Sequence, residues 1–309
     1  MPPARAMTVS DWALLTVLSV LWGGSFFFNK VAVLELPPIT VAAGRIGFGA
    51  LLLVAMAKAT GEALPRQASM WGALALMGLF NSVLPFSLII WSQQHVTSGL
   101  ASILIATTPL FTVVVAHCVT EDDKLTRARA AGLAAGLLGV IIMTGPDLLR
   151  DFGAHVLAQF ALLLAAMFYA TSAVYGRRFR SMPVVVIAAG QMTAAAVMIV
   201  PLMLLIDPPW TLPPPSPAAI GAIAGLAGLS TALGYLIYFR VLARAGATNL
   251  LLVNFMIPVS AILLGVAFLG ERIEPRQIAG MLLIAVGLAA IDGRPVRWIG
   301  SAWPAARTR

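Results

Sequence analysis

The sequence is poor in charged residues and almost free of cysteine. Only 10% of its 309 residues are charged, whereas 60% are hydrophobic, and the mean hydropathy is +0.94. A water-soluble domain of this length cannot bury so much apolar surface, so we expect the chain to lie largely in lipid. Cys118 is the single cysteine, which excludes an intrachain disulfide and argues against redox chemistry.

Acidic residues and histidines are also scarce, and they are absent from the middle of every long apolar segment. The 12 acidic residues and the three histidines all fall in connections or near segment ends. Buried carboxylates are the usual proton carriers of transporters, so we predict that no span of this chain holds one. No spacing of His, Cys, Ser or carboxylates is typical of a metal site or a nucleophile. We therefore predict no catalytic residue, no metal and no cofactor, and we do not expect an enzyme.

Long apolar segments fill most of the chain instead. Each is close to the length of about 20 residues that crosses a hydrocarbon core as a helix. The first has no small-residue cleavage site behind it, which favours a retained helix over a signal peptide. We predict an all-α integral membrane protein with spans at 11–30, 37–58, 70–92, 97–119, 127–145, 155–175, 183–206, 217–239, 247–269 and 275–292.

Basic residues are divided unevenly between the two sides that ten spans create. The side with both termini holds 15 of the 20 Lys and Arg residues, and the opposite side holds Lys30, Arg150, Arg272 and Arg276. Cytoplasmic loops carry such an excess. We therefore expect both termini, with the tail 294–309, in the cytoplasm and the protein in the cell inner membrane. The net charge of +8 is then explained by the orientation of the protein in the membrane, and we predict no nucleic-acid partner.

Five short blocks recur along the chain at a nearly constant offset of 146 to 149 residues. In one of them, PPITVAAGR at 37–45 matches MPVVVIAAGQ at 182–191. The two halves, 1–147 and 148–293, each hold five spans. Because five is odd, the second half crosses the membrane in the opposite sense. Such inverted repeats around a central cavity are typical of alternating-access transporters, with a site near the midplane.

Two segments, WGGSFFFNK at 22–30 and IPVSAILLGVAFLGERIEPRQIAGMLLIAVG at 257–287, resemble the EamA-type drug/metabolite transporter superfamily. The most specific spacing is that of Pro258, Gly270, Glu271, Gln277, Gly280 and Gly287. The resemblance implies that each half is one five-helix EamA-type repeat. It implies a cavity bounded by spans 1, 3, 4, 6, 8 and 9, and the transport of amino acids, other metabolites or organic cations. Overall, the chain is most similar to bacterial inner-membrane exporters of amino acids, aromatic ones included.

Uncharged polar and aromatic residues gather at mid-span depth. A cavity built from them suits an amphipathic zwitterion, whereas a sugar nucleotide would need several basic residues. Helix packing is the alternative for each residue, and the two amides Asn81 and Asn254, our first choices, would then join helices. The predicted substrate-binding residues are Trp22, Ser25, Asn29, Asn81, Phe86, Thr108, Tyr169, Tyr235 and Asn254. Thr107, Thr171, Ser230 and Thr231 lie at similar depth.

Pro109 and Pro258 take equivalent positions in the fourth and ninth spans. Each removes a main-chain donor and frees a carbonyl four residues earlier. We predict hinges or gates at these prolines, and static kinks that only shape the bundle are the alternative. The GxxxG pairs at 132–136 and 221–225 permit close helix contacts, which we expect within a monomer rather than between the subunits of a dimer.

Arg45 is a charged residue deep within an apolar segment. It lies eight residues after Pro37, which is about 12 Å into the hydrocarbon core. Its counterpart in the second half is Gln191. A structural polar pair, in which each residue donates to carbonyls of a neighbouring helix, explains both copies and is the interpretation we favour. Binding of a substrate carboxylate explains only the charged copy and stays open.

These patterns together predict a secondary transporter that exports amino acids with aromatic or other hydrophobic side chains. An efflux carrier for organic cations, drugs or other metabolites is the nearest alternative. An integral-membrane enzyme and a non-transporting membrane scaffold are the alternatives from other classes. The expected partners are a small-molecule substrate and membrane lipid.

Overall fold

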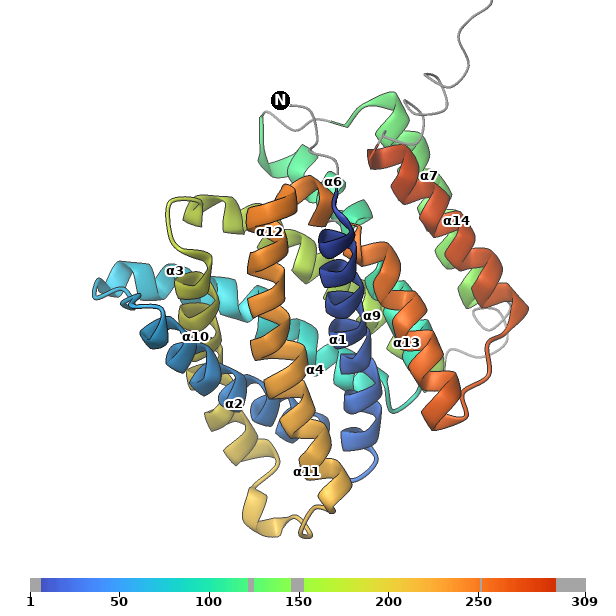
Figure 1. Cartoon of the computed structure of the whole chain (residues 1–309). Helices are drawn as coiled ribbons and strands as arrows, with labels where there is room; N and C mark the ends of the chain where they lie inside the picture. The colour runs from blue at the N-terminus through green and yellow to red at the C-terminus, as the bar shows by residue number, and fades with distance from the viewer. Residues whose placement is uncertain (1–6, 122–124, 146–152, 251, 293–309) are drawn as a thin grey trace, which may run out of the picture.

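The computed structural model describes residues 7–121, 125–145, 153–250 and 252–292, and within these ranges the regular structure is entirely helical. Seven helical segments are long and apolar enough to cross a membrane, and three shorter apolar helices complete a bundle of ten spans (Figure 1). The predicted ten-helix membrane fold is therefore confirmed. The predicted boundary between residues 147 and 148 and the tail 294–309 lie outside the described residues.

The first five spans alternate in direction from the N-terminus. The helix α1 begins at a capping box, in which the Thr8 hydroxyl accepts from the Asp11 N–H and the Asp11 carboxylate accepts from the Thr8 N–H. The elements are α1 (Val9–Val33), α2 (Pro38–Ala59), α3 (Ala68–Gly78) with the π-helical η1 (Leu79–Val83) and α4 (Leu84–Ser92), α5 (Ser98–Ile105) with α6 (Thr108–Val119), and α7 (Arg127–Thr144).

The last five spans repeat this order. They are α9 (Ala154–Tyr175) with the 3₁₀ turn η2 (Gly176–Phe179), α10 (Val184–Ile206), α11 (Pro217–Ala224) with the π-helical η4 (Gly225–Leu233) and α12 (Gly234–Leu250), α13 (Val253–Leu269), and α14 (Pro275–Asp292). The short 3₁₀ turn η3 (Pro209–Thr211) lies in the connection 207–216. The ninth span begins at Val253 rather than at 247, because α12 continues to Leu250 across a kink at Gly246, where φ is 81°.

The two halves pack around each other in a reciprocal way. The helix α2 lies against α10, α7 lies against α14 at the edge of the bundle, and the pairing of α1 with α13 is repeated by α9 with α5 and α6 (Figure 1). Both described chain ends lie at one end of the bundle, and the proline-rich connection 207–216 lies at the other, which we call the proline-loop end.

Glycines form the contact between α7 and α14. A Cβ atom added at Gly132 would lie 2.5 Å from the carbonyl oxygen of Gly287, and one added at Gly287 would lie 2.5 Å from that of Gly132. Gly139 and Gly280 contact each other in the same reciprocal manner, at 2.7 and 2.6 Å. Such exchange of contacts is what a twofold axis imposes on two equivalent elements. The GxxxG pair at 132–136 is thus used within the bundle, and the monomeric state remains a prediction.

The third and eighth spans each carry a π-helical segment at equivalent positions, η1 and η4. A π-helical turn inserts an extra residue and reorients the side chains around it, and such turns are frequent at functional sites. The equivalent prolines differ, however. Pro109 starts a new helix, α6, after a break at residues 106–107, whereas Pro258 lies inside the continuous helix α13. The hinge or gate role of both prolines remains a prediction.

Charged side chains tie the connections at the proline-loop end. The Nζ atom of Lys30 donates to the carbonyls of Gln93 (2.5 Å) and Val96 (3.1 Å), just after α4. The carboxylate of Glu271 accepts from the first two main-chain N–H groups of α5, at 2.7 and 3.3 Å. A cation at a helix C-terminus and an anion at a helix N-terminus are both favourable. First-half and second-half residues therefore hold the same turn.

Candidate functional site

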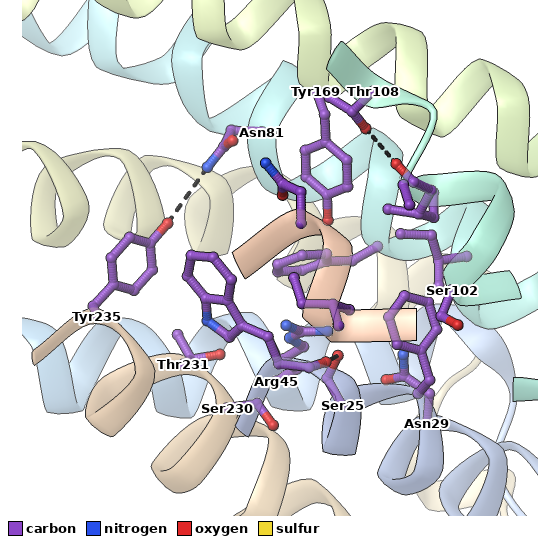
Figure 2. Close-up of a pocket in the computed structure, with 18 residues that line it drawn as sticks. Ser25, Asn29, Arg45, Asn81, Ser102, Thr108, Tyr169, Ser230, Thr231 and Tyr235 are labelled. Carbon is purple, nitrogen blue, oxygen red and sulfur yellow. Dashed lines mark hydrogen bonds between the residues drawn. The ribbon is translucent and has the colours of Figure 1, made fainter. Parts of the chain in front are cut away.

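A cavity of about 250 Å³ lies between spans from both halves of the bundle (Figure 2). Its lining comes from spans 1, 3, 4, 6, 8 and 9, as the resemblance implies, and also from span 2 through Arg45. Small-molecule pockets typically measure about 300–1,000 Å³, so this cavity suits a ligand at the small end of that range.

All nine predicted substrate-binding residues lie on the wall of this cavity. They come from six different spans, and Figure 2 shows their side chains converging on one space. Their position is therefore established for Trp22, Ser25, Asn29, Asn81, Phe86, Thr108, Tyr169, Tyr235 and Asn254. Their role in binding a substrate remains a prediction.

Several lining residues are not among the substrate-binding residues predicted from the sequence. Ser102 could have been found, because it lies on the helical face that extends back from Thr108 at spacings of three. The apolar lining residues carry no signal that separates them from ordinary core residues. The additional lining residues are Phe26, Arg45, Ile89, Ser102, Ile105, Ala106, Ser230, Thr231 and Ile257.

Two threonines of similar depth do not reach the cavity. Thr107 is buried in the break between α5 and α6, where its hydroxyl donates to the Leu104 carbonyl. Thr171 stands on the exposed side of α9 and donates to the Met167 carbonyl. A threonine in a membrane helix satisfies its hydroxyl within its own turn, so depth alone does not place it in a cavity.

The amide of Asn81 is engaged within the protein. Its Oδ1 atom accepts from the Ser172 hydroxyl at 3.0 Å. Its Nδ2 atom donates to the Tyr235 hydroxyl at 3.5 Å, as Figure 2 shows. Gln191 also donates to the Tyr235 hydroxyl, at 3.2 Å. These contacts join spans 3, 6, 7 and 8, which is the helix-joining alternative considered for Asn81.

Arg45 does not make the main-chain contacts expected of a structural pair. Its guanidinium donates no hydrogen bond to any described residue, and its carbon lies 3.8 Å from the centre of the Phe86 ring. The residue is 8% exposed, and no described carboxylate forms an ion pair with it. Gln191 likewise donates to a side chain, Tyr235, rather than to a carbonyl. The guanidinium therefore contacts an aromatic face where we expected main-chain carbonyls.

Buried polar atoms without a hydrogen-bond partner concentrate at the cavity. Five of the nine such atoms among the described residues are the Nδ2 and Oδ1 of Asn29, the Nε of Arg45 and the hydroxyl oxygens of Ser230 and Thr231. An unsatisfied buried polar group costs about 1–3 kcal/mol, and a cluster of them at a cavity indicates that a ligand or water supplies the missing partners.

These unsatisfied groups occupy one wall of the cavity. They belong to α1, α2 and η4, which pack against one another, and Figure 2 shows Arg45, Ser230 and Thr231 along one side. The facing wall, from spans 3, 4, 6 and 9, combines apolar residues, among them Ile89, Ile105 and Ile257, with the neutral polar residues Asn81, Ser102, Thr108 and Asn254. Among the described residues, no carboxylate lines the cavity and no cluster of metal-ligating side chains is present. The arrangement can hold an amphipathic molecule with its polar group toward spans 1, 2 and 8.

The model of the EamA-like transporter family matches this chain twice, at residues 11–145 and 156–291. YedA of Escherichia coli (strain K12), named an uncharacterized inner membrane transporter, is 28% identical over 293 residues, covering 91% of this chain and 92% of that protein. YoaV of Bacillus subtilis (strain 168), an uncharacterized transporter, is 24% identical over 282 residues, covering 89% of this chain and 94% of YoaV.

One relative carries a name that mentions a substrate. A probable terminal-alkyne amino-acid exporter of Streptantibioticus cattleyicolor is 26% identical over 285 residues, covering 92% of this chain and 93% of that protein. A solved crystal structure aligns over 91% of this chain and 96% of its own, with a TM-score of 0.64 and 20% identity. At that identity the alignment shows a shared fold alone.

Proposed function

Because this chain belongs to the EamA-like transporter family, we propose that it carries an amino acid with a hydrophobic side chain through its central cavity. The family and the relatives make it a multi-pass membrane transporter. The substrate class, the inner-membrane location and the outward direction of transport are our proposal, and the amino-acid exporter among the relatives supports the first of them.

The observation that carries the proposal is the unpaired guanidinium of Arg45. It is buried at a cavity in which no carboxylate is present to neutralise it. A buried charge without a counter-ion is costly, and a carboxylate that pairs with it recovers much of that cost. A guanidinium also binds a carboxylate through two parallel hydrogen bonds. We therefore assign the substrate carboxylate to Arg45, against the structural role that the sequence favours.

The isoleucines of the facing wall account for the hydrophobic side chain of the proposed substrate. Once the carboxylate lies against spans 1, 2 and 8, the remainder of a small amino acid faces Ile89, Ile105 and Ile257. Burial of that side chain contributes roughly 25 cal/mol per Å² of apolar surface.

An organic cation is the second candidate, and the aromatic lining favours it. The rings of Trp22, Tyr169 and Tyr235 offer faces that attract cations. Arg45 opposes it, because a cation entering the cavity meets a fixed positive charge with no carboxylate beside it. The two candidates therefore differ in the sign of the charge that the cavity accepts.

Flux into liposomes containing the purified protein tests the proposal. Labelled phenylalanine should cross without chemical change and faster than its methyl ester, which lacks the carboxylate. Arg45→Gln, which copies the second half's Gln191, should keep normal abundance but lose this preference. Thr171→Val, on the exposed side of α9, is the matched control and should keep it. Equal flux of the acid and the ester in the wild type, or flux of a quaternary amine alone, would contradict the proposal.

A further inference from the structure

We propose that Asn29 binds the ammonium group of the substrate, and that this one amide makes the cavity select amino acids over simple carboxylic acids. The inference rests on the proposed function, because it concerns the other charged group of the same substrate. It assigns the two ends of a zwitterion to two neighbouring helices, α1 and α2.

Asn29 is the most completely unsatisfied residue of the cavity. Its side chain is 1% exposed, it lines the cavity, and neither its Oδ1 nor its Nδ2 has a hydrogen-bond partner. Its neighbour one turn earlier on the same helical face is engaged within the helix: the Ser25 hydroxyl donates to the Trp22 carbonyl at 2.6 Å. Both amide atoms of Asn29 are therefore available to a ligand.

The height of Asn29 relative to Arg45 fits one small zwitterion. The helices α1 and α2 are antiparallel and joined by the short connection 34–37. Asn29 lies four residues before the end of α1, and Arg45 lies seven residues after the start of α2. At 1.5 Å per residue these positions are about 6 Å and about 10 Å from the same end of the bundle. The difference is less than one helical turn, and the ammonium and carboxylate groups of an α-amino acid are attached to the same carbon.

The chemistry of the lining leaves neutral oxygens as the partners of an ammonium group. No described carboxylate lines the cavity, and the lining oxygens that are fully buried without a hydrogen-bond partner are the Oδ1 of Asn29 and the hydroxyls of Ser230 and Thr231. An amide oxygen accepts two hydrogen bonds, whereas a hydroxyl also carries a proton that must be directed away from the ammonium group. The adjacent cation, Lys30, is directed away, since its Nζ atom is held by the carbonyls of Gln93 and Val96.

Competition for labelled phenylalanine flux in liposomes tests the assignment. The competitors are unlabelled phenylalanine and 3-phenylpropanoate, which has the same ring and carboxylate but no ammonium group. Against the wild type, phenylalanine should compete about ten- to a hundred-fold better. In Asn29→Leu, which removes both amide atoms but keeps the branching at Cγ, that ratio should fall close to one, mainly because phenylalanine competes less well.

Asn29→Asp provides the second variant, because it keeps an oxygen acceptor and adds a negative charge. It should keep or raise the preference for phenylalanine, since the carboxylate attracts the ammonium group and repels phenylpropanoate. Thr171→Val should leave the ratio unchanged. A ratio that persists in Asn29→Leu, or that collapses in Asn29→Asp, overturns the role of Asn29 while leaving amino-acid transport intact. A wild type that moves no amino acid overturns the proposed function and this inference with it.

Discussion

Phe86 is the partner of the buried guanidinium of Arg45, and the ring fixes where that charge lies. A cation over an aromatic face gains about 0.5–2 kcal/mol, depending on how far water is excluded. The ring leaves the edge of the guanidinium, with its N–H groups, free to donate to a ligand. Phe86 is therefore a positioning residue for the charge as well as part of the cavity wall.

Phe86→Leu should weaken carboxylate binding without removing it. The substitution deletes the aromatic face but keeps an apolar side chain, so Arg45 loses its restraint and the half-saturating phenylalanine concentration should rise about two- to five-fold. Phe86→Tyr keeps the face and should behave as the wild type. The measurement is the concentration dependence of flux at matched protein abundance. Unchanged values in Phe86→Leu would mean that the ring only fills space.

Tyr235→Phe should lower the stability of the folded protein. The change removes the hydroxyl that accepts from Asn81 and Gln191, and so leaves two donors without an acceptor. The expected cost is about 1–3 kcal/mol, measured as a lower unfolding temperature in detergent. Tyr169→Phe is the control, because the Tyr169 hydroxyl makes no hydrogen bond to a described residue. Equal unfolding temperatures for the two variants would show that the Tyr235 hydroxyl is dispensable for folding.

At the scale of elements, the two GxxxG pairs look alike in the sequence but differ in the structure. Only the pair at 132–136 takes part in the glycine contact between α7 and α14. Gly132→Ala places a methyl group 2.5 Å from the Gly287 carbonyl oxygen, so the two backbones must move apart. Overpacking of this kind costs about 1–3 kcal/mol. Gly221→Ala, in the other GxxxG pair, meets no atom within 4 Å, and it should be neutral or slightly stabilising because alanine favours helix. Thermal unfolding of both variants tests the contrast, which similar losses would contradict.

The ten spans and nine cavity residues were predictable because lipid leaves polar side chains few places to go. A large polar side chain at mid-depth cannot satisfy its polar group within its own helical turn, as Thr171 does, so it is favoured toward the bundle interior, and Trp22, Asn29 and Tyr235 do lie on the cavity wall. The π-helical segments and the break at residues 106–107 were not predictable, because they depend on how neighbouring helices fit. The partner of Arg45 escaped prediction for a similar reason: Phe86 lies on another span, and no spacing along the chain links the two.

At the scale of the whole molecule, we expect both termini in the cytoplasm. The motive is the charge bias of 15 basic residues against four. A reporter active only in the cytoplasm should work when fused after Arg309, and a reporter active only in the periplasm should not. The same pair of reporters fused within the connection 207–216 is the control and should give the opposite result. Periplasmic activity after Arg309 would reverse the orientation of both halves.

The turn held by Lys30 and Glu271 affects the equilibrium between a closed and an open proline-loop end when no substrate is bound. Four charge-assisted hydrogen bonds close it, and bonds of that kind contribute about 1.5–3 kcal/mol each. Moving a two-state equilibrium from 1:99 to 99:1 takes about 5.5 kcal/mol, so an opening that broke these bonds would be rare. We therefore expect the protein without substrate to rest with that end closed. With the orientation proposed above, the substrate enters from the cytoplasm, and its binding energy must offset the cost of release on the far side.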